Sequence, residues 1–118
     1  MVGGGAVAWY FTPSLCENVE VRRLPSPDGR LDLVVFERNC GATTDFSSQV
    51  SLVPHGASVD DRPGNVYIYG HRVPLALTWH SAAAIAVHYP PGFRGLTEAR
   101  SVRGVSVEFA EDTAVKEP

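Results

Sequence analysis

The sequence predicts an all-β, mostly antiparallel domain, arranged as a small sandwich or curled sheet of about six to eight strands with at most one short helix. Apolar and polar residues alternate in several short segments, and clusters of Gly, Pro, Asp and Ser separate these segments. The 118 residues allow one domain, because half that length would bury too small a core. We place the domain at 16–110, between an apolar segment 1–15 and a tail 111–118 that should fray.

A β-hairpin is predicted over residues 19–36. Val19 and Val21 alternate with charged residues, which is the period-two pattern of a half-buried strand. Residues 24–29 then form a tight turn, because proline presets φ, aspartate bonds its own backbone and the final glycine accepts a positive φ. The apolar run 31–36 returns as a strand that is buried on both faces near its middle.

Three further segments of the chain have strand patterns. Residues 46–53 alternate, with apolar side chains on one face and serines and a glutamine on the other. Residues 54–64 are rich in Pro, Gly and Asp and predict a flexible excursion. Residues 65–69 and 105–109 then predict two more strands.

The segment 75–89 has two interpretations. Its apolar residues face one core in a hairpin if the connecting loop has an odd length, and a loop of about three residues near 81–84 meets this condition. The alternative is a short helix over 82–87, since alanine is the best helix former. The parity of the strands favours the hairpin.

The N-terminal segment 1–15 carries no charged side chain. It is shorter than the roughly 20 residues that a bilayer-spanning helix needs, and it lacks the basic start of a signal peptide. One interpretation is the end of an export or anchor segment, which would tether the protein to a membrane. The other is a first strand at 7–11 that packs on the core.

The chain has two cysteines, Cys16 and Cys40. In an exported protein such a pair indicates a disulfide, and closing a loop of about 25 residues would stabilise the fold by roughly 3 kcal/mol. The alternative is two reduced, buried thiols.

The charge of the chain argues against a nucleic-acid partner. The net charge is −3, and the ten Lys and Arg residues are scattered along the sequence. Binding to a phosphate backbone requires a concentrated basic surface, so no nucleic-acid function is expected.

No motif for catalysis or for a cofactor is evident. In the hairpin interpretation His80 and His88 share a sheet face and could begin a metal site, but a third ligand, such as Asp60 or Asp61, would have to join them. Solvated histidines are the simpler interpretation, and we predict no metal and no cofactor. The serine pair at 47–48 lies within a strand and lacks the Gly-x-Ser-x-Gly turn of an exposed nucleophile, so we predict no enzyme.

The loop after the first hairpin is the candidate binding site. Arg38, Thr43, Thr44 and Asp45 display a cation, two hydroxyls and a carboxylate between two predicted strands, and such loops often carry binding function. The alternative is that the threonine hydroxyls only satisfy the backbone of the loop.

Several motifs resemble a family of small exported or lipoprotein-like bacterial proteins of unknown function. They are Pro-Ser-Pro-Asp-Gly at 25–29, the run containing Cys-Gly-Ala-Thr-Thr at 34–44, Phe-Ser-Ser-Gln-Val-Ser at 46–51, and the closing segments around Trp79, 85–89 and 102–109. The resemblance implies an exported domain and supports pairing of Cys16 with Cys40, but it implies no activity. Asp45 departs from the glycine that is usual there.

We therefore expect a non-catalytic extracytoplasmic module, in the periplasm or cell envelope, that binds a protein or envelope component as an inhibitor or immunity-like partner does. One alternative is a structural envelope component that self-associates through its strand edges. The other is a small metal-binding protein or enzyme that uses His80 and His88.

Overall fold

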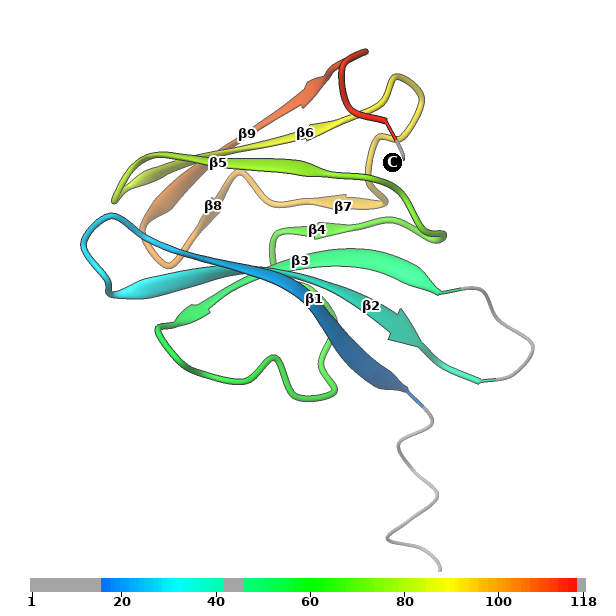
Figure 1. Ribbon diagram of the computed structural model, residues 1–118, viewed down its shortest axis with the longest axis horizontal. Coiled ribbons are helices and arrows are strands. Elements are labelled where there is room, and N and C mark those ends of the chain that lie inside the picture. The colour runs from blue at the N-terminus through cyan, green and yellow to red at the C-terminus, as the bar shows by residue number, and fades with distance from the viewer. Residues whose placement is uncertain (1–15, 42–45, 117–118) are drawn as a thin grey trace, which may run out of the picture.

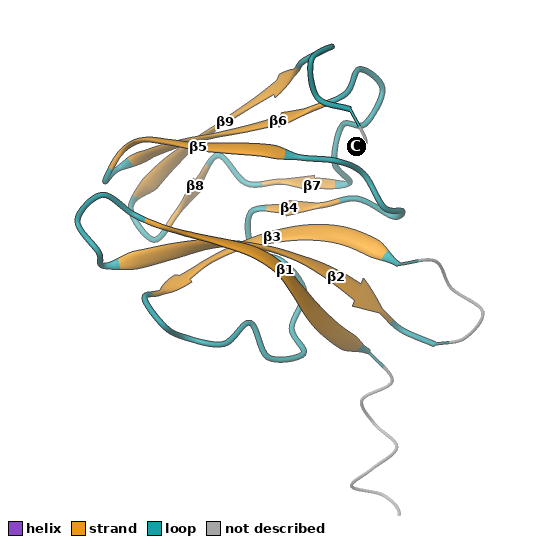
Figure 2. Ribbon diagram, viewed as in Figure 1, coloured by secondary structure: helices purple, strands orange, loops and turns teal. Residues whose placement is uncertain are grey.

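The computed structural model describes residues 16–41 and 46–116, and in these residues it contains nine strands and no helix (Figures 1 and 2). The strands are β1 (Glu17–Pro25), β2 (Leu31–Asn39), β3 (Ser47–Pro54), β4 (Tyr67–Ile68), β5 (Ala76–Ser81), β6 (Ala84–Tyr89), β7 (Thr97–Glu98), β8 (Ser101–Val102) and β9 (Val105–Glu111). With no helix there, nothing in this part of the chain could cross a bilayer as a helix. The predicted all-β class is confirmed, and the short strands β4, β7 and β8 explain the larger number of strands.

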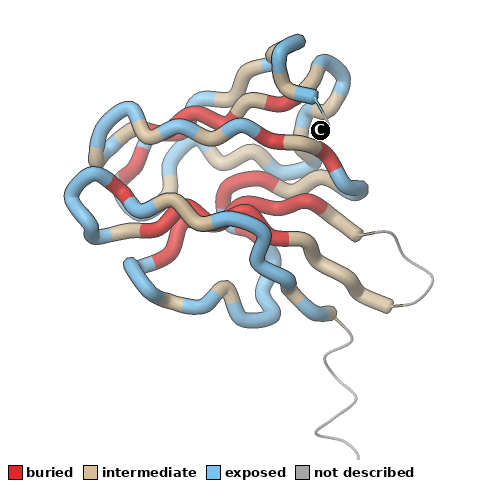
Figure 3. Tube along the Cα trace, in the orientation of Figure 1, coloured by how far each residue is buried: buried red, intermediate tan, exposed pale blue. Residues whose placement is uncertain are grey.

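The strands form two facing sheets. One sheet has five strands in the order β1-β2-β3-β4-β7, and the other has four in the order β5-β6-β9-β8. All pairs are antiparallel except β6 and β9, which run parallel. The buried residues lie mainly between the sheets, so the molecule is the predicted sandwich (Figure 3).

The predicted hairpin of β1 and β2 is confirmed, and its turn is held by Ser26. The Ser26 hydroxyl donates to Asp28 and accepts the N–H groups of Arg30 and Leu31. Gly29 has a φ of 73°, in the left-handed region that glycine adopts without strain. Side-chain and backbone chemistry therefore fix the register of the hairpin locally.

The prediction that β1 is half-buried through its valines is wrong. Val19 is 48% and Val21 57% exposed. A β-bulge between Glu20 and Arg22 leaves Val21 without a partner in β2 and breaks the alternation.

β2 and β3 are buried on both faces, because the loop 54–66 lies against the outside of the first sheet. Ala57 and Val59 of this loop pack on a small cluster of Val34, Phe36 and Val53. The Gly64 N–H also donates to the buried Gln49 side chain. The segment predicted as a flexible excursion thus covers the outer face of the sheet.

The second hairpin, β5 and β6, is confirmed over the helical alternative. Leu77 and Trp79 pair with Val87 and Ile85, so all four side chains lie on the core face. The extra residue that the parity requires is supplied by a bulge between Trp79 and Ser81, next to a two-residue turn.

The side of the sandwich formed by β1 and β5 is closed. The Trp79 indole N–H donates to the Leu24 carbonyl (2.9 Å), and the Arg22 guanidinium donates to the Leu75 carbonyl (3.0 Å). These bonds join the edge strands of the two sheets.

The Cys16–Cys40 disulfide is present and joins the start of β1 to the end of β2. It confirms the predicted pairing of the two cysteines. Such bonds persist in oxidising compartments and are rare in the cytosol.

Part of the predicted frayed tail makes hydrogen bonds. β9 extends to Glu111, and the Asp112 N–H donates to the Tyr89 carbonyl (2.8 Å). The Asp112 carboxylate pairs with His88 and accepts the Ala114 N–H. The start of the tail is therefore attached to β6, and the N-terminal segment 1–15 lies outside the described residues.

Candidate functional site

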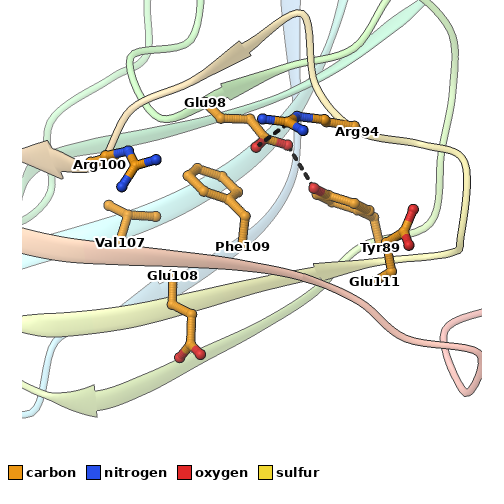
Figure 4. Close-up of a pocket in the computed structure, with 8 residues that line it drawn as sticks. All are labelled: Tyr89, Arg94, Glu98, Arg100, Val107, Glu108, Phe109 and Glu111. Atoms are coloured by element: carbon orange, nitrogen blue, oxygen red, sulfur yellow. Dashed lines mark hydrogen bonds and ion pairs between the residues drawn. The ribbon is translucent and has the colours of Figure 1, made fainter.

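The side of the sandwich opposite β1 and β5 contains a groove of about 650 Å³ between the segment that carries β7 and strand β9 (Figure 4). Its lining residues are Tyr89, Arg94, Glu98, Arg100, Val107, Phe109, Glu111 and, from the opposite face of β9, Glu108. Binding sites for small ligands usually have volumes of roughly 300–1,000 Å³. We call this feature the β7–β9 groove.

The floor of the β7–β9 groove is aromatic. Tyr89 and Phe109 project from β6 and β9, and both rings stack on the buried ring of Tyr67, at centroid distances of 5.7 and 6.4 Å. The Tyr67 hydroxyl donates to the Phe93 carbonyl (2.8 Å), which fixes the ring. Burial, together with the nearby Tyr89 and Glu98, raises the pKa of Tyr67, so it stays a neutral donor.

Glu98 connects the two walls of the groove. Its Oε2 atom accepts the Tyr89 hydroxyl (2.7 Å) and the Gly95 N–H (2.9 Å). Burial and this bond to Glu98 raise the pKa of Tyr89 to about 12. The hydroxyl therefore remains protonated, and the carboxylate already has donors within the protein.

The two arginines of the groove have fewer partners than Glu98 has. Glu111 accepts the Gly92 N–H (3.0 Å), whereas the Arg94 Nε lies 3.8 Å from Glu98 and its side chain is 81% exposed. The Arg100 guanidinium has no acceptor among the residues that the structure describes, and it lies beside Val107 and Phe109 (Figure 4). The groove thus offers guanidinium donors beside an aromatic floor, and these donors suit a single anionic group on a ligand.

The edge of β9 is also open along the groove. β8 pairs only with residues 105–106, and the Val107 N–H donates to the Arg100 carbonyl. No strand of the described chain pairs with this edge beyond Val107. Successive residues of a strand direct their N–H and C=O groups to opposite sides. Ser106 and Asp112 donate their N–H groups toward β6, so the odd-numbered Phe109 directs its backbone groups to the open side.

The structure gives Arg38, the first residue of the predicted binding loop, a structural contact. Its Nη1 donates to the Asn18 side chain (3.0 Å) and to the Asp61 carbonyl (2.8 Å), so it ties β2 to β1 and to the covering loop. Thr43, Thr44 and Asp45 lie outside the described residues.

The structure separates the two histidines of the possible metal site. His88 pairs with Ala76 across the hairpin, and His80 lies four residues further along β5, which corresponds to about 13 Å. His88 is bonded to Asp112 (3.0 Å), and the described residues contain no group of three metal-ligating side chains. Zinc ligands lie about 2 Å from the metal, so this pair does not form one site.

The hydroxyls of the serine pair at 47–48 bond the backbone and not a histidine side chain. The Ser48 hydroxyl bonds the backbone of Val73, and the Ser47 hydroxyl donates to the Tyr69 carbonyl. The exposed His55 is instead paired with the buried Asp32 (2.8 Å), which also accepts Arg23 and the Gly56 N–H. These contacts hold the covering loop to the sheet.

Comparisons with protein-family models, with curated proteins and with solved structures found no match. The β7–β9 groove therefore rests on its own geometry. Sequence reasoning missed it, because Arg94 and Arg100 lie in segments without a strand pattern. The only sequence signal was the clustering of cations and aromatic residues around 89–100.

Proposed function

We propose that this chain is a non-catalytic binding module and that the β7–β9 groove is its site. The supporting observation is the contrast between the two sides of the sandwich. The β1 and β5 side is closed by direct bonds, whereas the opposite side leaves an aromatic floor, guanidinium donors and a strand edge exposed. The proposal favours a protein or envelope component as the partner, because a strand edge is recognised by another polypeptide.

The test compares the proteins captured from an envelope extract of the producing cell by matched baits. The double variant Arg94→Glu/Arg100→Glu replaces both guanidinium groups of the groove by carboxylates. The matched control, Arg30→Glu/Arg62→Glu, reverses two exposed arginines outside it. A partner that the wild type and the control capture, and that the groove variant loses by at least about tenfold, supports the proposal. Equal melting temperatures of the two variants show that folding is intact.

A third bait, with alanine at Thr43, Thr44 and Asp45, separates the groove from the predicted loop and leaves Arg38 and the Cys16–Cys40 disulfide in place. If this bait alone loses the partner, the loop is the site and the groove proposal is wrong. If all baits capture the same proteins equally, both sites are wrong and a structural role becomes the better hypothesis.

We also propose that the protein acts outside the cytoplasm, in the periplasm or cell envelope, with segment 1–15 as a membrane tether. The disulfide between Cys16 and Cys40 supports the location. The test is the intact mass of the protein from its native host after thiol alkylation. Alkylation of both cysteines only after reduction is expected, and alkylation without reduction would contradict the location.

Extraction of the protein only by detergent would support the tether, and release by salt alone would contradict it.

A further inference from the structure

The open edge of β9 has one blocked end. β8 runs antiparallel to β9 and lies beside the first residues of β9. Arg100, which immediately precedes β8, lies opposite Val107 and accepts its N–H. The preceding residue, Ala99, has left this position and donates its N–H to Val66 in the other sheet. A polypeptide that pairs with β9 at Phe109 and Glu111 therefore meets the backbone of Arg100 and cannot continue along the strand.

A strand with a free end satisfies this geometry. If it runs antiparallel to β9, in the direction of β8, the end beside Arg100 is its C-terminus and carries a carboxylate. If it runs parallel to β9, that end is an N-terminus and carries an ammonium group. Arg100 lies at this end, and the described residues offer its guanidinium no acceptor. The charge favours the carboxylate, since a guanidinium binds a carboxylate in a bidentate manner and repels an ammonium group.

We propose that the β7–β9 groove binds the free C-terminal segment of a partner protein, which adds to the edge of β9 as an antiparallel strand with its terminal carboxylate on Arg100. The inference rests on the proposed binding function and names the class of partner. The backbone groups of Phe109 bond the added strand, and the aromatic floor receives an apolar side chain near its end. Two features reduce the repulsion of the ligand carboxylate by the acidic side chains of the groove. Arg94 lies 3.8 Å from Glu98 and partly offsets its charge, and Glu108 points away from the groove on the opposite face of β9 (Figure 4).

The first experiment uses a library of random seven-residue peptides displayed with free C-termini. We expect enrichment of a family of peptides with an apolar residue at or near the last position. The best peptide is then synthesised as the free acid and as the C-terminal amide, and the affinity of each is measured by fluorescence anisotropy. The amide should bind at least about tenfold more weakly, because it lacks the charge-assisted bonds to Arg100.

Variants of the protein test the role assigned to Arg100. Arg100→Gln should weaken the free acid to the level of the amide and leave the amide unchanged, which is the signature of a direct pair. Arg62→Gln removes an exposed arginine outside the groove and should change neither affinity. A paired strand directs every second N–H toward its neighbour. N-methylation of the peptide one residue at a time should therefore weaken binding at every second residue and have little effect at the residues between.

Three results would overturn the inference. The first is equal binding of the acid and the amide, and the second is an equal loss of affinity for both in Arg100→Gln. The third is selection of peptides that carry an essential internal Asp or Glu and need no free end. In each case loss of binding in Arg94→Glu/Arg100→Glu would keep the groove as a binding site with another ligand. If no peptide is enriched, the inference is wrong, and the bait comparison alone then decides the proposed function.

Discussion

Asp32 is a buried carboxylate whose charge is satisfied entirely by the protein. Its side chain is 1% exposed and accepts bonds from Arg23, His55 and the Gly56 N–H. Burial alone would raise the pKa of Asp32, but the Gly56 N–H, His55 and Arg23 outweigh it and lower the pKa to about 2. Asp32 thereby links the outer face of β2 to the loop that covers it.

The lowered pKa of Asp32 predicts a loss of stability in acid. The folded pKa of about 2 lies below the unfolded value near 4, so the stabilisation is complete above about pH 4 and is lost as the pH falls toward 2. The shift corresponds to about 2 kcal/mol in the free energy of unfolding. Urea unfolding across this pH range should show that Asp32→Asn is less stable than the wild type at neutral pH by about that amount, and nearly equal to it at the acid end.

The matched control for Asp32 is Asp60→Asn. Asp60 is exposed and has a φ of 47°, a conformation that asparagine tolerates well. This variant should unfold like the wild type at every pH. A constant difference between Asp32→Asn and the wild type across the pH range would contradict the assigned role of the charge.

Gly95 tests whether the floor of the β7–β9 groove is closely packed. A Cβ atom on this residue would lie 2.8 Å from the Tyr67 ring and 2.8 Å from the Thr97 carbonyl. Gly95→Ala should therefore destabilise the fold by about 1–3 kcal/mol and shift the ring beneath the groove. Gly70→Ala is the control, because its nearest neighbour would be a Leu96 methyl at 3.9 Å, and both variants are compared by thermal unfolding. Equal melting temperatures would show that the Tyr67 ring moves without cost.

At the scale of elements, the two hairpins are predictable from sequence because their contacts are local. The turn at Ser26 and Gly29 and the alternation in β5 and β6 are visible in consecutive residues. The exposure of Val19 and Val21 was not predictable, since the bulge between Glu20 and Arg22 that breaks the alternation has no signal in the sequence. Burial of the serines of β3 depends on where the loop 54–66 lies.

The disulfide acts on one element, the β1–β2 hairpin, at the end opposite its turn. Replacing Cys16 and Cys40 by serine should lower the free energy of unfolding by about 3 kcal/mol, because the unfolded chain regains the freedom of the closed loop. Guanidinium unfolding of the double variant and of the reduced wild type should give the same loss. A reduced wild type as stable as the oxidised protein would contradict this account.

At the scale of the whole molecule, the groove arises from a connection that no local pattern encodes. The chain leaves β6, forms β7 in the first sheet, and returns to place β9 parallel to β6. This crossing brings residues 94–100 next to 107–111 and leaves one side of the sandwich open. The sequence predicted β9, but its partners and direction depend on the packing of both sheets.

The strand edges of the whole molecule also predict its oligomeric state. β1 and the open part of β9 are exposed edges, and such edges can pair with a second copy. At β9 the backbone of Arg100 blocks a strand that continues along the edge. At β1 the bulge at Val21 interrupts the edge, and the neighbouring Glu20, Arg22 and Arg23 carry charges that oppose close pairing. Sedimentation velocity from dilute to highly concentrated samples should therefore show a monomer of 12.7 kDa. A dimer that grows with concentration would instead favour the self-associating envelope component, and a Val21→Lys variant that abolished the dimer would locate its interface at β1.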